Sequence, residues 1–238
     1  MCEKDEMENL PAGSGAGMEE QSPAAVILAA GFGRRLGGRP KAALHIGGLS
    51  LLERLARALH SARIDDISIV IGPYRETLAP LARRCGIDVL LHDREDTQLA
   101  ESQALALRTH VARRPGRDLM LLLTDLPLLD DEHIRVLLDV WQRRPAGIEA
   151  QMPVVGGTRG HPLLLSWKVV RQLAADPAFA GIRGWLNGHP DIVRPFVTNT
   201  HAYIADLDTP EDLAALTQRL RPQQVTWPAP WDANTPQE

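Results

Sequence analysis

A glycine-rich, cationic segment is the part of the sequence best suited to chemistry. Residues 31–38 read Gly-Phe-Gly-Arg-Arg-Leu-Gly-Gly, and Arg39, Pro40 and Lys41 follow. Glycines let the backbone turn tightly and bring its N–H groups close to a ligand. The cations are concentrated here although the formal net charge of the chain is -4. The segment therefore predicts a polyphosphate site. A solvated turn with surface arginines is the alternative.

Two familiar phosphate-binding loops do not match this segment. The Walker pattern closes with Gly-Lys-Ser/Thr, whereas Lys41 follows a proline and precedes an alanine. The dinucleotide pattern needs Gly-x-Gly-x-x-Gly and an acidic residue that ends the second strand. Here the glycines are spaced Gly-x-Gly-x-x-x-Gly, and the second apolar run, residues 67–72, is followed by Pro73. The missing carboxylate disfavours an NAD-type oxidoreductase.

Aspartates in two later segments could hold a metal ion. Asp125 directly follows the apolar run of residues 119–124, and ligands bind at the carboxyl ends of parallel strands. Asp206 and Asp208 alternate with apolar residues at strand spacing, which predicts that they point the same way and repel unless a cation lies between them. Mg²⁺ prefers one or two carboxylates plus phosphate oxygens and waters. Backbone capping by Asp125 and simple solvation of the pair are the alternatives.

These segments resemble the signature of MobA-like nucleotidyltransferases. Leu-Ala-Ala-Gly at 28–31, Arg-Arg-Leu-Gly at 34–37 and Pro-Lys at 40–41 look like the family's nucleotide loop. Asp-Leu-Pro-Leu at 125–128 is similar to its Asp-Met-Pro-Leu, and residues 206–212 are similar to its Asp-Ile-Asp-Thr-Pro-Glu-Asp. The resemblance covers residues 24–220. It implies a Rossmann-like three-layer α/β/α fold of the nucleotide-diphospho-sugar transferase type, with a mostly parallel sheet.

The resemblance also implies roles for individual residues. The implied nucleotide contacts are Leu28, Ala29, Ala30, Gly31, Gly33, Arg34, Lys41 and Ser102. The implied catalytic residues are Arg35, Lys41 and Asp125. Asp125 and Asp208 are the implied ligands of Mg²⁺, with Asp206 as the alternative to Asp208. His161, in a Gly-His-Pro segment, is the implied acceptor contact or a turn residue, and both readings stay open.

The implied reaction transfers a nucleoside monophosphate from CTP or GTP to a phosphorylated acceptor and releases pyrophosphate. Leu-Ala-Ala-Gly is typical of the cytidylyltransferase branch that acts on molybdopterin, so Ala30 favours CTP. Departures from the family pattern at Leu126 and around Ser102 leave a sugar or alditol phosphate open as the acceptor. A rival of another class is a non-catalytic nucleotide-binding protein that partners a molybdenum enzyme.

Alternating strands and helices are expected to position these residues. Apolar runs that predict strands buried on both faces are residues 24–30, 67–72, 87–91 and 119–124. Amphipathic stretches between them predict helices on both faces of the sheet. Two helix starts carry capping boxes, one from Ser50 to Glu53 and one from Thr209 to Asp212. Further strands, some of them antiparallel, are expected near residues 151–155, 162–165, 192–197 and 202–207.

Bulk properties narrow the class of protein. A pI near 6.1 gives no general attraction to nucleic acid or to an anionic membrane surface. Cys2 and Cys85 cannot form a disulfide framework, the first residues are acidic, and no apolar run approaches the roughly 20 residues that span a bilayer. A cytoplasmic location is expected. One domain, residues 23–221, is expected between tails at 1–22 and 222–238.

Overall fold

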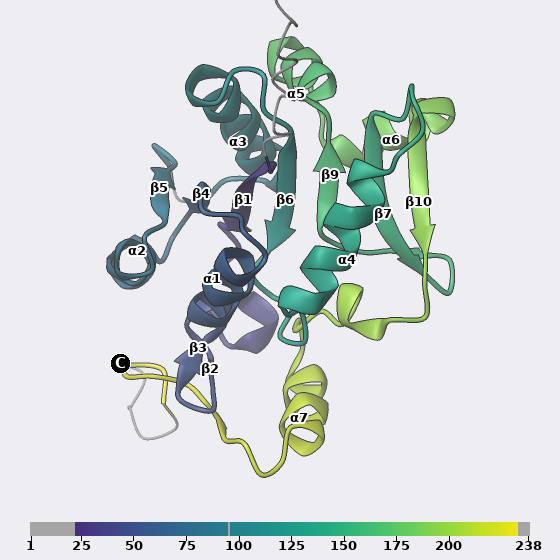
Figure 1. The fold of residues 1–238 in the computed structure, drawn as a ribbon. Helices are drawn as coiled ribbons and strands as arrows, with labels where there is room; N and C mark the ends of the chain where they lie inside the picture. The colour runs from purple at the N-terminus through teal and green to yellow at the C-terminus, as the bar shows by residue number, and fades with distance from the viewer. Residues whose placement is uncertain (1–21, 95, 233–238) are drawn as a thin grey trace, which may run out of the picture.

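An eight-stranded, mostly parallel sheet forms the centre of the computed structural model, which describes residues 22–94 and 96–232 (Figure 1). The strand order is β10 (Val193–Val197), β7 (Ala150–Val155), β9 (Leu163–Leu165), β6 (Leu119–Leu123), β1 (Ala24–Ala29), β4 (Ile67–Ile71) and β5 (Asp88–Leu91), and β8 (Thr158–Arg159) pairs with β7. Only β9 and β8 run antiparallel to their neighbours. The predicted sheet is confirmed. The expected tail at residues 1–22 lies outside the described residues, except for its last residue.

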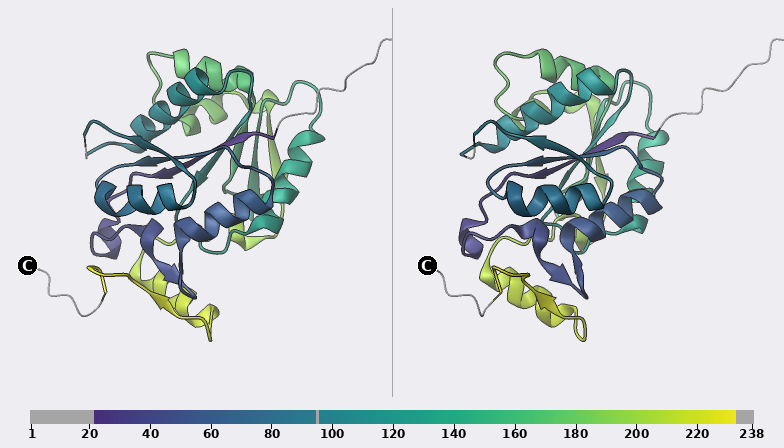
Figure 2. Two further views of the ribbon diagram at one scale, coloured as in Figure 1. Left: turned by 60° about the vertical axis from the view of Figure 1, so that its left-hand side comes forward. Right: turned by 90° about the vertical axis from the view of Figure 1, so that its left-hand side faces the viewer.

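Helices cover both faces of this sheet (Figure 2). One face carries α1 (Leu51–Ser61), α2 (Arg75–Arg84) and α4 (Asp131–Gln142), and the other carries α3 (Leu99–Arg113), α5 (Trp167–Ala175) and α6 (Ile182–Gly188). Successive side chains of β1 alternate between the two cores, since Ile27 packs in the first and Leu28 in the second. The three-layer α/β/α fold is confirmed. Among the described helices, none is both long and apolar enough to cross a membrane.

A third, smaller core lies at the lower end of Figure 1, between α7 (Pro210–Arg219) and a separate three-stranded sheet. That sheet consists of β2 (His45–Ile46), β3 (Leu49–Ser50) and β11 (Val225–Thr226). The core is called the small core below, and its buried members are Leu36, Leu44, Ile46, Leu51, Leu207 and Leu216. Residues 225 and 226, within the segment expected to be a tail, therefore pair with the body of the fold.

Short 3-10 turns complete the chain, and both predicted capping boxes are present. The turns are η1 (Arg34–Leu36), η2 (Lys41–Ala43), η3 (Pro190–Ile192) and η4 (His201–Tyr203). At the start of α1, the Ser50 hydroxyl accepts from the Glu53 amide, and the Glu53 carboxylate accepts from the Ser50 amide at 2.8 Å. Thr209 and Asp212 make the same reciprocal pair at the start of α7. Local sequence signals thus define the helix starts.

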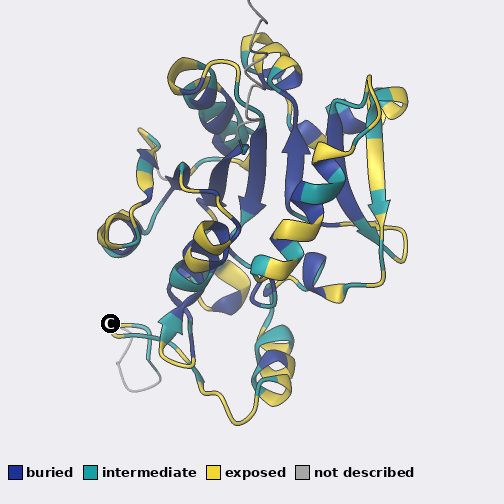
Figure 3. Cartoon of the chain, in the orientation of Figure 1, coloured by how far each residue is buried: buried dark blue, intermediate teal, exposed yellow. Residues whose placement is uncertain are grey.

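One strand prediction is wrong, and a second strand is present but less buried than predicted. Residues 202–207 form η4 and an irregular segment, because the Leu207 amide donates to the Asp125 carbonyl at 2.9 Å instead of joining a strand ladder. The strand-spacing argument for Asp206 and Asp208 therefore fails. The strand predicted at residues 87–91 forms as β5, but β5 is the last strand of the sheet and is not buried on both faces, since its first and last residues, Asp88 and Leu91, are exposed. Figure 3 shows exposed segments on this edge strand.

Candidate active site

The glycine-rich loop leaves the carboxyl end of β1, an inner strand that pairs in parallel with β4 and β6. Gly33 and Gly37 flank η1 with φ values of 57° and 74°, the left-handed region that favours glycine. The Gly33 carbonyl accepts from the Leu36 amide at 2.8 Å and from the Gly38 amide at 3.1 Å. Leu36 is buried in the small core. The loop is therefore a tight, anchored turn.

Gly33 is the position in this loop least tolerant of a side chain. A Cβ there would lie 2.2 Å from the Arg39 carbonyl oxygen, in addition to the left-handed φ. We expect Gly33→Ala to lower the free energy of unfolding by about 1–3 kcal/mol, measured by denaturant titration. Gly184→Ala is the matched control, because its Cβ would meet open space. Equal stabilities of the two variants would contradict the tight packing of the loop.

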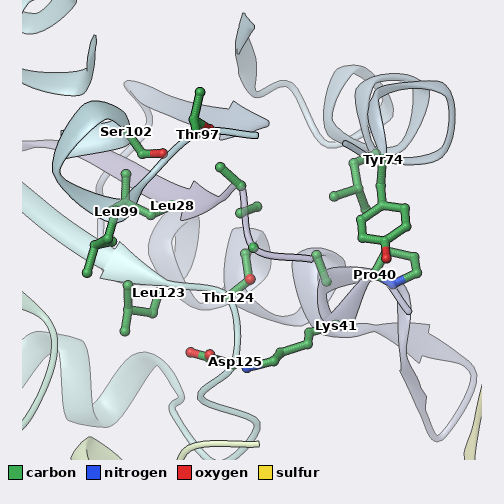
Figure 4. A pocket seen from close by; sticks show the side chains of 15 residues that line it. Leu28, Pro40, Lys41, Tyr74, Thr97, Leu99, Ser102, Leu123, Thr124 and Asp125 are labelled. Carbon is green, nitrogen blue, oxygen red and sulfur yellow. Dashed lines mark hydrogen bonds and ion pairs between the residues drawn. The ribbon is translucent and has the colours of Figure 1, made fainter. Parts of the chain in front are cut away.

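A cavity of about 260 Å³ lies beside this loop, at the carboxyl ends of β1 and β6 (Figure 4). The predicted nucleotide contacts that line it are Leu28, Ala29, Ala30, Gly31, Lys41 and Ser102. Asp125 lines it as well, whereas Gly33 and Arg34 do not. The cavity thus lies against the two ends of the loop, residues 28–31 and 40–42, and extends to Asp125, one of the two carboxylates predicted to bind a metal ion.

Lys41 lies between the two predicted metal ligands. Its Nζ atom is 2.8 Å from Oδ2 of Asp125 and forms a second ion pair with Oδ1 of Asp208. Oδ2 of Asp208 accepts from Nη2 of Arg35 at 2.7 Å. These four residues come from η1, η2, the end of β6 and the loop before α7. The fold therefore brings together all the predicted catalytic and metal-binding residues.

The four side chains balance in charge, two cations against two carboxylates, and Asp206 adds a third carboxylate beside them. Burial would lower the pKa of Lys41, but the carboxylates of Asp125 and Asp208 outweigh it and raise that pKa above its ordinary value, so the lysine is an ammonium. The hydrogen bond from Lys41 holds the pKa of Asp208 below its usual range. Partial burial, together with the negative charges of Asp125 and Asp208, raises the pKa of Asp206 to about 6. A further cation would relieve this crowding.

The donor set fits a divalent metal that arrives with a phosphate ligand. Oδ1 of Asp125 is buried and has no hydrogen-bond partner among the described residues, which is costly for a carboxylate oxygen. Within residues 22–94 and 96–232, no three His, Cys, Asp or Glu side chains are arranged to hold a metal ion by themselves. Mg²⁺ needs no such cage, because it completes its octahedron with waters and phosphate oxygens.

The remaining predicted residues have other contacts. The guanidinium of Arg34 lies 4.9 Å from the centre of the Phe32 ring and is exposed. Ser102 is buried, and its hydroxyl is hydrogen-bonded to Nε2 of His92 at 2.9 Å. Burial lowers the pKa of His161, against the opposing negative charge of Asp125. His161 is therefore close enough to Asp125 to sense its charge, and its own amide donates to Tyr203.

Several residues lining the cavity escaped the sequence analysis. They are Tyr74, Leu78, Thr97, Leu99, Leu123 and Thr124, with Ala42 next to Lys41. Tyr74 stands out because its hydroxyl donates to the Phe32 carbonyl of the loop at 2.7 Å. Tyr74 and Thr124 each follow the carboxyl end of a parallel strand, so the rule that pointed to Asp125 could have found them too.

A comparison with known families decides the classification of the chain. The family model of the MobA-like NTP transferase domain matches residues 25–193. The chain belongs to this family. The MobA-like match includes the glycine-rich loop, Lys41, Asp125 and His161, and it ends before Asp208 and the C-terminal segment. The chain is thus a member of a nucleotidyltransferase family, as its motifs imply.

One relative of known name agrees with this classification. The bifunctional protein GlmU of Azorhizobium caulinodans is 30% identical over 202 residues, which are 84% of this chain and 42% of that protein. The chain therefore spans about two fifths of that relative's length.

Solved structures share the fold of this MobA-like chain. The crystal structure of Rv0371c from Mycobacterium tuberculosis H37Rv has a TM-score of 0.69 at 25% identity, over 83% of this chain and 99% of that one. A further Rv0371c structure, a complex with manganese, has a TM-score of 0.61 at 23% identity, over 83% and 98% of the two chains. The 4-diphosphocytidyl-2C-methyl-D-erythritol synthase of Anaerococcus prevotii has a TM-score of 0.64 at 16% identity, over 84% and 96%. The predicted nucleotide-diphospho-sugar transferase type of fold is confirmed.

Proposed function

We propose that this protein transfers a nucleoside monophosphate from a nucleoside triphosphate to a phosphorylated small-molecule acceptor, with release of pyrophosphate. The observation that carries the proposal is the cluster of Lys41, Asp125 and Asp208 at the cavity beside the glycine-rich loop. Such a cluster supplies both the cation and the carboxylates that a metal–triphosphate needs. Membership in the MobA-like family supports the same reaction.

The proposed step is an in-line displacement at the α-phosphorus. An oxygen of the acceptor phosphate forms a bond to the α-phosphorus, and the bond from that phosphorus to the bridging oxygen of the β-phosphate breaks. Pyrophosphate leaves with the electron pair. Arg35 and Lys41, with the amides of residues 31–33, would bind the phosphates and neutralise the leaving group. No general base is required, because the acceptor phosphate is already ionised.

Asp125 and Asp208 are the proposed ligands of Mg²⁺. The buried, unpartnered Oδ1 atom of Asp125 and the crowding of carboxylates around Lys41 support this assignment. When bound, the metal would neutralise phosphate charge and orient the triphosphate. The manganese in the Rv0371c complex supports a divalent cation in a protein of this fold. His161, near Asp125, is the proposed contact for the acceptor.

CTP is the proposed donor and molybdopterin is the proposed acceptor. A molybdenum enzyme would then receive the product, and the reaction would take place in the cytoplasm. Ala30 in the Leu-Ala-Ala-Gly segment supports the choice of CTP. A sugar or alditol phosphate is the second candidate acceptor. It is supported by the similarity to GlmU and by the fold shared with the 4-diphosphocytidyl-2C-methyl-D-erythritol synthase.

A substrate screen tests the proposal. Purified protein is incubated with Mg²⁺, each common ribonucleoside triphosphate and one acceptor at a time: molybdopterin, a hexose 1-phosphate or an alditol phosphate. We expect pyrophosphate release that requires an acceptor, is fastest with CTP and stops when EDTA removes the metal. Nucleotide binding without pyrophosphate release from any pair would instead identify a non-catalytic accessory protein.

A further inference from the structure

The C-terminal segment, residues 225–231, runs along the outside of the glycine-rich loop. Figure 2 shows this yellow segment beside the purple turn that contains η1. β11 pairs antiparallel with β2, and the Gly47 amide donates to the Gln224 carbonyl at 2.9 Å. The segment lies beyond the match to the MobA-like family model, which ends at residue 193. Its two tryptophans each contact a residue that touches the loop.

Trp227 contacts Arg39, which closes one side of the loop. The Arg39 guanidinium lies 5.5 Å from the centre of the Trp227 ring, a cation–π contact. The Arg39 carbonyl oxygen in turn lies where a side chain on Gly33 would have to go. Displacing Arg39 would therefore open the turn at Gly33, whose carbonyl organises η1.

Trp231 contacts Tyr74, which closes the other side. The two rings meet edge to face, with centroids 6.1 Å apart and planes at 88°. Tyr74 lines the nucleotide cavity, and its hydroxyl donates to the Phe32 carbonyl at 2.7 Å. The same hydroxyl oxygen is 3.8 Å from the position of a Cβ on Gly38. Tyr74 thus spans both arms of the loop, and Trp231 supports it from outside.

The small core connects this segment to the charged cluster as well. Val225 and Trp227 pack against the core that contains Leu36 and Leu207. These two leucines are the chain neighbours of Arg35 and Asp208, whose side chains form an ion pair at 2.7 Å. The C-terminal segment therefore packs against the core that anchors the residue next to each partner of that pair.

We infer that Trp227 and Trp231 are positioning residues of the nucleotide site. They hold Arg39 and Tyr74, and through them keep the glycine-rich loop in the shape that presents its amides to the triphosphate. The inference rests on the proposed function. A positioning role can be told apart from a merely stabilising one. Loss of a positioning residue weakens the binding of nucleotide more than the binding of the acceptor.

Alanine variants of the two tryptophans test this inference. We expect Trp227→Ala and Trp231→Ala each to raise the Kd and the KM for CTP about two- to tenfold, with little change in the KM for the acceptor. Trp231→Phe should restore most of the affinity, because a phenyl ring keeps the edge-to-face contact. Trp185→Ala is the matched control, since Trp185 stacks on His189 at a centroid distance of 4.6 Å and its helix, α6, lies on the opposite side of the molecule from the C-terminal segment (Figure 1).

Hydrogen exchange gives a second readout that needs no nucleotide. In the free protein, the amides of residues 31–38 should exchange faster in both alanine variants and at the wild-type rate in Trp185→Ala. Wild-type protein that binds no triphosphate would overturn the proposed function and this inference together. A different result would overturn this inference alone: both alanine variants bind the triphosphate as tightly as the wild-type protein, their loop amides exchange at the wild-type rate, and only their Tm is lower.

Discussion

Replacing Asp125 by asparagine is expected to reduce kcat about a hundred- to a thousandfold, because it removes a charge that the proposed Mg²⁺ site requires. The fold should survive. Asparagine has the same shape, the Asp125 carbonyl that accepts from Leu207 is untouched, and Lys41 keeps its ion pair with Asp208. The measurement is kcat for pyrophosphate release, with Tm as the check on folding. Near-wild-type turnover would show that Asp125 is not a metal ligand.

Asp206→Asn is the matched control for this variant and separates the two candidates for the second ligand. Asp206 is a carboxylate in the same loop as Asp208 and allows the same substitution, but the ion pairs with Lys41 and Arg35 are made by Asp208. We expect less than about a tenfold loss of kcat for Asp206→Asn and a loss like that of Asp125→Asn for Asp208→Asn. The reverse order would assign the metal to Asp206.

Replacing Lys41 by methionine is expected to have the second large effect, a fall in kcat of about a hundredfold or more. Methionine keeps an apolar stem of similar length but removes the ammonium that neutralises the carboxylates and, in the proposed reaction, the phosphates. The measurement is kcat at saturating CTP. Addition of Mg²⁺ should also raise the Tm of the variant more than it raises the Tm of the wild-type protein. In the variant, Asp125 and Asp208 repel each other unless a metal ion replaces the lost ammonium.

Lys168→Met is the control for the loss of a lysine ion pair as such. Lys168 pairs with Glu149 at 2.9 Å, but its side chain is 70% exposed and lies on α5, away from the cavity. Exposed ion pairs contribute little, so kcat and Tm should stay near the wild-type values. Equal losses in Lys41→Met and Lys168→Met would contradict a specific role for Lys41.

The parts of the site that sequence could predict are those with local signals. The glycine-rich loop and Asp125 follow apolar runs, and parallel strands place their carboxyl ends at one edge of the sheet. The ion pair between Arg35 and Asp208 joins residues 173 positions apart, so no local pattern predicts it. The resemblance to a family implied the roles of both residues, but it implied no contact between them.

The errors have physical causes as well. Asp206, Leu207 and Asp208 alternate in polarity because Leu207 alone is buried in the small core. Burial of a single residue in a loop thus gives the same local pattern as a strand. The two-residue strand β11 is too short to leave a periodic signal. Contacts of Trp227 and Trp231 with the glycine-rich loop depend on that strand and therefore emerge only from the tertiary structure.

The central claim is that the cluster around Lys41 is a centre for nucleotidyl transfer. Parallel reactions with CTP radiolabelled at the α or at the γ phosphate test it most directly, once the substrate screen has identified the acceptor. The α label should enter the acceptor, and the γ label should appear as pyrophosphate in equal amount. Release of the γ label as inorganic phosphate, or its transfer to the acceptor, would contradict nucleotidyl transfer and indicate a hydrolase or a kinase instead.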